Sequence, residues 1–197
     1  LAAQPLGRDV VELMARSGAA YTPTLIISAG PDAEHYFIAR DDPANDPKMQ
    51  RFWPGFARDL KLRHVRWHTF EEYSFPAAAA GAAEILRAGG TVGVGAHGNI
   101  PGIGYQWEMQ ALAMGGMTPT EVLRAATLHS ARAIGREAEF GSLEPGKYAD
   151  LVILERDPRE DIANTLSIWQ VMKNGRLYDG DTLDEIWPRQ RAFPTPW

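Results

Sequence analysis

A single imidazole in a glycine-rich stretch is the sequence feature most suited to chemistry. The stretch runs from Gly89 to Gly102 and carries His97 between glycines 95 and 98. Thr91 to Val94 has the pattern of a short buried strand, so His97 is expected in the loop that follows it. Since α/β folds place their chemistry on such loops, His97 is a candidate general base or metal ligand. A histidine held only by structural hydrogen bonds is the alternative, and it stays open.

Two further histidines, His64 and His68, have a spacing that would place both on one face of a helix, as a metal site requires. Their flanks are basic and no acidic residue lies between them. Because a cationic neighbourhood disfavours a divalent ion, we expect surface histidines here rather than ligands.

The helix expected over Tyr105 to Met114 carries the other candidate site residues. Glu108 could reach His97 or a substrate amine as a second catalytic group, although a salt bridge on the surface or lining the core explains it equally well. Tyr105 and Gln106 are expected to bind substrate. His129 is expected to pack or cap where the later helix breaks.

The elements that must position these residues alternate between helices and short strands. Helices are predicted over residues 6–17 and 74–88, and a β-type run over 21–27 follows the first of them. Thr118 to Glu121 is a capping box with proline at the first helical position, so a helix should begin there and continue towards residue 134, with a possible break near His129.

The stretch from His35 to Phe70 shows no regular period, and we expect an irregular lid, binding loop or partner-facing insertion. Asp41 to Pro47 has the composition of a turn. The interleaved arginines and aromatics that follow are expected to pack back onto the body of the protein. Stacking on nucleic acid is the less favoured alternative, given the acidic total.

The last third of the chain is expected to be mainly β-structure. A turn over 141–147 leads into an apolar strand at 149–154. Strands at 167–172 and 176–178 are joined by Lys173-Asn174-Gly175, which is a hairpin signal. Asp150 is expected to anchor the turn.

The composition narrows the classes of function and partner. The 197 residues carry a net charge of -5, which disfavours binding to nucleic acid or an anionic membrane. No apolar run approaches the roughly 18 residues of a membrane span. The chain has no cysteine, which excludes disulfides and thiolate metal sites and suits a cytoplasmic protein. No targeting segment is visible, and the missing initiator Met suggests a piece of a longer protein.

Four segments together resemble metal-dependent amidohydrolases, with the nearest likeness to the imidazolonepropionase-like and prolidase-like branch. They are Thr22 to Leu25, the strand leading to His97, Leu112 to Thr127, and Gly141 to Leu154. The resemblance implies the C-terminal portion of a (β/α)8 TIM-like barrel, an α/β fold, plus part of a small β-sandwich. Residues 1–135 would be the last barrel strands and helices, with a long loop at about 29–73. Residues 136–197 would be the sandwich portion and tail.

The resemblance also bears on the site. The eighth barrel strand of the family normally ends Gly-Thr-Asp-Ala, and its Asp binds metal, whereas this chain reads Gly95-Ala96-His97-Gly98. His97 would then be a ligand of a divalent metal, most naturally zinc, or the base, but it cannot supply the charge of a carboxylate. A related branch carries Gly-Ser-His-Gly at this point. The other ligands of the family would lie before Leu1.

The resemblance therefore implies a hydrolase in which a metal-activated water cleaves an amide, peptide-like, cyclic amide or ester bond of a small-molecule or peptide-like substrate. One alternative is a catalytically incomplete fragment that folds by self-association, as a homo-oligomer, or against a missing N-terminal half. The other is a metal-free, esterase-like hydrolase that uses His97 with a hydroxyl, although no Gly-x-Ser-x-Gly elbow is present.

Overall fold

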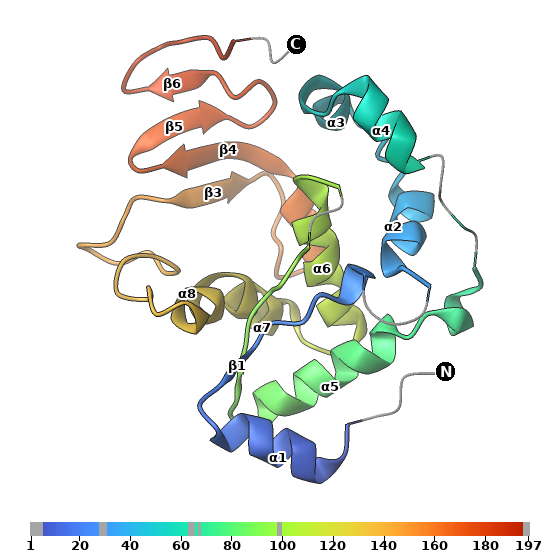
Figure 1. Cartoon of the computed structure of the whole chain (residues 1–197). Helices are drawn as coiled ribbons and strands as arrows, with labels where there is room; N and C mark the ends of the chain where they lie inside the picture. The colour runs from blue at the N-terminus through green and yellow to red at the C-terminus, as the bar shows by residue number, and fades with distance from the viewer. Residues whose placement is uncertain (1–5, 28–30, 63–65, 67, 98–99, 195–197) are drawn as a thin grey trace.

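The computed structural model describes residues 6–27, 31–62, 66, 68–97 and 100–194, and it has an α/β architecture (Figure 1). Strands β1 (Ala20–Tyr21) and β2 (Thr91–Val92) form a two-stranded parallel sheet, in which Ala20 lies opposite Thr91 and Tyr21 opposite Val92. A separate antiparallel sheet contains the four strands of the last third of the chain.

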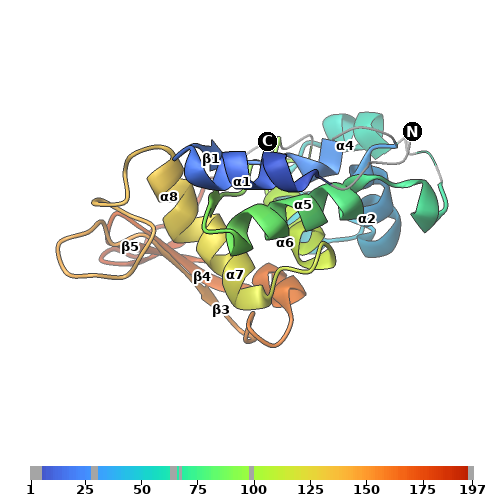
Figure 2. The same cartoon turned by 90° about the horizontal axis from the view of Figure 1, so that it is seen from below.

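Each parallel strand follows a helix, so the same helix–strand unit occurs twice. Helix α1 (Arg8–Arg16) precedes β1 and α5 (Phe75–Arg87) precedes β2. Both connections turn at a glycine with positive φ, Gly18 at 74° and Gly89 at 93°, a conformation that side chains resist. The two helices lie side by side (Figures 1 and 2). Both predicted helices are confirmed.

The first strand is shorter than the sequence predicts. The β-type run expected over 21–27 leaves the sheet after Tyr21 and forms a 3-10 turn, η1 (Leu25–Ile27). Pro23 has no N–H to give to a strand ladder. The N–H groups of Leu25 and Ile26 bond instead to a side chain of another helix. A distant acceptor therefore overrides the local β preference.

The prediction of irregular structure between residues 35 and 70 is wrong. This region forms helices α2 (Ala33–Asp41), α3 (Pro47–Phe52) and α4 (Gly55–Leu62) and the 3-10 turn η2 (Phe70–Glu72). Helix α2 is as long as α1, but its apolar residues are clustered at 36–39 instead of recurring with a helical period, and α3 and α4 are shorter. The side chain of Asp46, in the stretch read as a turn, accepts a bond from the N–H of Met49 at 2.8 Å and caps α3. His64 lies outside the described residues, so the predicted pair with His68 is outside them too.

The helices after β2 begin and end close to the predicted positions. Helix α6 (Ile103–Met114) is followed by α7 (Pro119–Arg124), and the Thr118–Glu121 capping box is present, with Thr118 N–H donating to Glu121 Oε2 at 2.7 Å. The predicted interruption near His129 is a π-helical turn, η3 (Ala125–His129), which leads into α8 (Ser130–Ala133).

The antiparallel sheet has the strand order β3 (Leu151–Leu154), β4 (Ile168–Lys173), β5 (Arg176–Asp179) and β6 (Glu185–Trp187). The 3-10 turn η4 (Ile162–Leu166) joins β3 to β4, and β6 was not predicted. Asn174 and Gly175 both have positive φ, 49° and 75°, as the predicted hairpin turn requires. Asp150 Oδ1 accepts from Asn174 N–H at 2.6 Å, and the carboxylate pairs with Lys173, so its anchoring role is confirmed.

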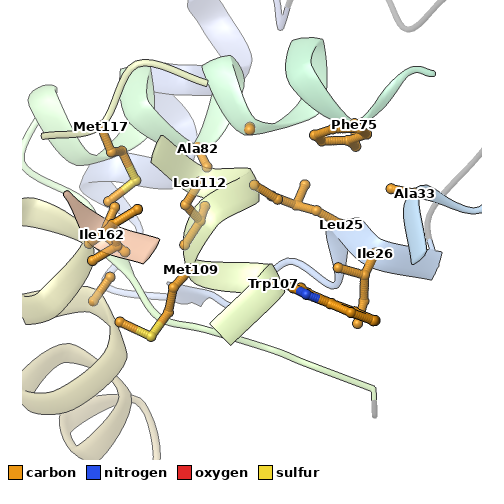
Figure 3. Packing of buried hydrophobic residues seen from close by; sticks show 14 of the residues in the cluster. Leu25, Ile26, Ala33, Phe75, Ala82, Trp107, Met109, Leu112, Met117 and Ile162 are labelled. Carbon is orange, nitrogen blue, oxygen red and sulfur yellow. The ribbon is translucent and has the colours of Figure 1, made fainter. Parts of the chain in front are cut away.

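The hydrophobic core lies among the helices. Figure 3 shows side chains of η1, α5 and α6 packed together, with Ile162 of η4 added from beside the antiparallel sheet. Trp107 and Phe37 stack with ring centroids 5.7 Å apart, which fixes α2 against α6. Within the described ranges, no residue of β3 to β6 belongs to this buried cluster. No helix among those described is both long and apolar enough to span a membrane.

Candidate active site

The segment that follows β2 runs against the segment that follows β1. Gly93 N–H donates to the Tyr21 carbonyl at 2.9 Å, and Gly95 N–H donates to the Pro23 carbonyl at 3.0 Å. The hydroxyl of Thr24 donates in return to the Gly95 carbonyl. A Cβ on Gly95 would lie 2.5 Å from the carbonyl oxygen of Thr22, so this approach requires glycine.

On its other side, the same segment is held by Ser130. The Ser130 hydroxyl accepts from Val94 N–H at 3.1 Å and donates to the Ala125 carbonyl at 2.7 Å. A Cβ on Gly93 would lie 3.0 Å from Ser130 Oγ. The Ala125 carbonyl, in the π turn η3, therefore accepts both the backbone N–H and the hydroxyl of Ser130. The backbone from Gly93 to Gly95 is therefore fixed from two sides.

His97 lies two residues beyond this fixed backbone, at the carboxyl end of β2, and it is exposed. This is the location that the sequence predicts. No group of three His, Asp or Glu side chains suited to a metal ion occurs in the described part of the chain. The described residues therefore do not fit a complete metal site, and His97 could contribute one ligand at most.

Glu108, the second predicted catalytic residue, is fully buried on α6. Its Oε1 accepts from Leu25 N–H at 2.6 Å and its Oε2 from Ile26 N–H at 3.1 Å. Burial raises the pKa of Glu108 to about 7, although the two backbone N–H groups favour the ionised form. The carboxylate thus faces η1 rather than solvent, and it is bonded to backbone rather than to the expected salt-bridge partner.

Tyr105 and Gln106, the predicted substrate-binding residues, begin α6. Tyr105 is 37% exposed, and its hydroxyl donates to the Ala126 carbonyl in η3 at 2.6 Å. Burial raises the pKa of Tyr105, while a hydrogen bond with Ser130 opposes that rise. Gln106 is half-buried, and its Oε1 is a buried atom without a hydrogen-bond partner among the described residues. Both residues lie on the same helix as Glu108, but only Tyr105 is joined to the Ser130 network.

Sequence reasoning missed two residues that shape this region, Thr24 and Ser130. Thr24 lies in the Thr22–Leu25 segment that carries the family resemblance, but no role was assigned to it, and Ser130 has no local signal beyond being a hydroxyl near a helix break. His129, which was expected to pack at the helix break, bonds to the backbone of Val92. Burial lowers the pKa of His129, and its Nδ1 is enclosed without a partner in the described structure.

Comparison with known proteins identifies the family. The model of the amidohydrolase family matches residues 79–178, which is half of the chain and includes β2, His97 and α6. The chain belongs to the amidohydrolase family. Ochratoxinase of Aspergillus niger is 36% identical over 100 residues, covering 48% of this chain and 21% of that protein. Imidazolonepropionase of Symbiobacterium thermophilum is 48% identical over 65 residues, covering 32% and 15%.

Solved structures share the fold. A Xaa-Pro dipeptidase with bound methionine superposes with a TM-score of 0.59 at 24% identity, covering 89% of this chain and 38% of that one. The crystal structure of A. niger ochratoxinase gives 0.57 at 25% identity, covering 88% and 35%. The chain therefore has an α/β fold of the TIM-barrel-like amidohydrolase kind. It spans 21% of the length of the ochratoxinase sequence that it matches.

Proposed function

We propose that the protein is a hydrolase that cleaves an amide, peptide-like or cyclic amide C–N bond, or an ester, in a small-molecule or peptide-like substrate. The observation that carries this proposal is the family match over residues 79–178 together with an exposed His97 at the carboxyl end of β2. The family match supports it, as do the sequence relatives ochratoxinase and imidazolonepropionase.

The proposal includes a finer assignment of the fold. Residues 1–135 would supply the last strands and helices of a barrel, with β1 as the seventh strand and β2 as the eighth. Residues 136–197 would supply a portion of a β-sandwich and the tail. Two observations support it: β1 and β2 are parallel and each follows a helix, and the sheet from β3 to β6 is antiparallel and separate.

In this proposal His97 is either one ligand of a divalent metal, zinc by preference, or the general base. Amidohydrolases generally depend on a metal, and imidazole is suited to both roles. The other ligands would come from outside the described residues. Tyr105 would contact substrate through its exposed ring, because its hydroxyl is already bonded to Ala126, and Gln106 would lie beside it. Glu108 does not react, because it is buried and both of its oxygens are engaged.

The test compares His97→Ala with His68→Ala in the full-length protein. His68 is a suitable control, since its side chain lies beside Glu72 of η2 and not in the segment after β2. Hydrolysis of N-acyl amino acids, Xaa-Pro dipeptides and simple esters is measured, with elemental analysis for zinc. We expect at least about a 100-fold loss of kcat/KM for His97→Ala and none for His68→Ala. Full activity in His97→Ala would refute the role of His97. An active enzyme that contains no metal and is unaffected by chelators would refute the proposed metal dependence.

A second candidate function is association, with another copy of the chain or with an N-terminal half. The antiparallel sheet favours it, because Val152 and Trp169 are 55% and 53% exposed. Exposed apolar side chains of this size commonly mark an interaction surface. Light scattering of the 197-residue chain tests it: a stable monomer with cooperative unfolding would refute self-association.

A further inference from the structure

We infer that Glu108 is a positioning residue for His97: it holds η1 in the place from which Thr24 and Pro23 fix the backbone at Gly95. This inference rests on the proposed function only in giving His97 its chemical role. The structural link itself runs through four hydrogen bonds between α6, the segment after β1 and the segment after β2.

The first step of the link joins Glu108 to η1. The N–H groups of Leu25 and Ile26 open this short helical turn, where backbone N–H groups lack acceptors inside the helix. The carboxylate of Glu108 accepts both, at 2.6 and 3.1 Å, and a negative charge is favourable at such an end. The side chains of Leu25 and Ile26 are themselves buried against α5 and α6 (Figure 3), so η1 has little freedom to shift while Glu108 is present.

The second step joins η1 to Gly95. Thr24 directly precedes Leu25, and its hydroxyl donates to the Gly95 carbonyl. Pro23, one residue earlier, accepts from Gly95 N–H at 3.0 Å. Both polar groups of the Gly95 backbone are therefore bonded to the two residues before η1. With Ser130 holding Val94 from the other side, the path of the chain is set as it leaves β2.

The third step is the short distance along the chain from Gly95 to His97. His97 is exposed, and the last backbone group held by these bonds is only two residues before it. A reacting group needs its geometry held to within about 1 Å, and a residue away from the chemistry can impose that placement. Glu108 is fully buried in the core and Gly95 is half-buried, so Glu108 would act on His97 through η1 and Thr24.

The chemistry of the side chain explains why a carboxylate suits this position. Glutamine has one oxygen and one NH2 group at the same places, so it can accept from only one of the two backbone N–H groups and must point a donor at the other. Glu108→Gln therefore removes one of the two hydrogen bonds to η1 and changes little else. Thr24→Val removes only the hydroxyl bond to Gly95 and keeps the size of the side chain, which separates the second step from the first.

The experiment measures backbone amide shifts and hydrogen exchange by NMR in the 197-residue chain for Glu108→Gln, Thr24→Val and Glu121→Gln. Glu121 is the control, because it is a helix-capping acid on α7. We expect Glu108→Gln to shift the amides of Leu25, Ile26, Gly95 and His97 and to speed exchange at Gly95 about tenfold or more. Thr24→Val should move Gly95 and His97 while leaving Leu25 and Ile26 in place. Glu121→Gln should move none of these four amides.

Changes confined to Leu25 and Ile26 in Glu108→Gln would overturn the inference, since Glu108 would then cap η1 without reaching His97. Unchanged amide shifts of Gly95 and His97 in Thr24→Val would also overturn the inference, even if Glu108→Gln failed to fold. In the full-length enzyme, positioning predicts a lower kcat with KM near the wild-type value for both variants. The proposed function fails separately: if His97→Ala keeps full activity while the amide shifts follow the expected pattern, the structural link stands without the catalytic role.

Discussion

Two carboxylates in different regions both accept hydrogen bonds from backbone N–H groups, but one is buried and the other is close to solvent. Glu108, in the helical core, accepts two backbone N–H groups at the start of η1. Asp150, beside the antiparallel sheet, accepts the N–H of Asn174 at the hairpin between β4 and β5 and pairs with Lys173. Burial raises the pKa of Glu108 to about 7, whereas the bond to Lys173 and then the Asn174 N–H lower the pKa of Asp150. Burial therefore decides how much free energy it costs to ionise each carboxylate. It also decides how much stability is lost when the side chain is removed.

The largest effect should come from Glu108→Ala. It leaves the N–H groups of Leu25 and Ile26 buried without acceptors and opens a cavity beside them, so we expect a loss of about 3–5 kcal/mol in the free energy of unfolding. Urea denaturation of the 197-residue chain measures it. Glu121→Ala on the exposed capping box should cost about 1 kcal/mol. Equal losses in the two variants would contradict the distinction between buried and exposed carboxylates.

The pH dependence of stability separates the same two carboxylates. The pKa of Glu108 in the folded state is raised from 4.5 to about 7. Between these two pH values, the folded state therefore binds more protons than the unfolded state. The contribution of this proton binding to the free energy of unfolding is full below about pH 4.5. It is lost as the pH rises to about 7, by up to roughly 3 kcal/mol. Asp150 has the opposite sign: its lowered pKa gives stability above 3.8 that is lost as the pH falls through the folded pKa.

Denaturation midpoints between pH 4 and 8 test this dependence, with Glu108→Gln expected to flatten the fall between pH 4.5 and 7. Tyr21 faces the same carboxylate, and its pKa is raised by burial and by Glu108, so it stays neutral over this range. A fall that persists unchanged in Glu108→Gln would have to come from another group.

The close approach at Gly95 should give an intermediate effect. In Gly95→Ala the new methyl group would lie 2.5 Å from the Thr22 carbonyl oxygen, a backbone atom that cannot move away without disturbing β1. We expect a loss of about 2 kcal/mol in the free energy of unfolding and disturbed amides around His97. Gly55→Ala is the matched control, because the nearest heavy atom to its Cβ is the flexible end of Arg58 at 3.7 Å. Differential calorimetry distinguishes the two.

The smallest effect should come from Asp150→Ala. The hairpin loses one charge-assisted bond to Asn174 and a largely solvent-screened ion pair to Lys173, so we expect about 1 kcal/mol or less. Asp150→Asn keeps an acceptor for the Asn174 N–H and should recover most of that loss. Thermal unfolding of both variants measures it, and a loss as large as that of Glu108→Ala would show that the hairpin supports more than its own sheet.

The sequence predicted best where one short segment contains its own partners. The Thr118–Glu121 capping box, the Asn174-Gly175 turn and the helices α1 and α5 all depend on neighbours a few residues apart, and all are confirmed. The position of His97 after a strand was also readable from its glycines. The helices between residues 31 and 62 were missed, because α2, although as long as α1, has its apolar residues clustered at 36–39, and α3 and α4 are shorter.

What the sequence alone determined is the family resemblance, the alternation of helices and strands, and the location of His97 past the end of β2. Only the tertiary structure decided that the run after Tyr21 leaves the sheet, that Glu108 is a buried cap rather than an exposed acid, and that Thr24 and Ser130 hold the backbone before His97. The physical reason is range. Glu108 lies 83 positions from Leu25, and Ser130 lies 36 positions from Val94, so no local pattern could reveal that they meet.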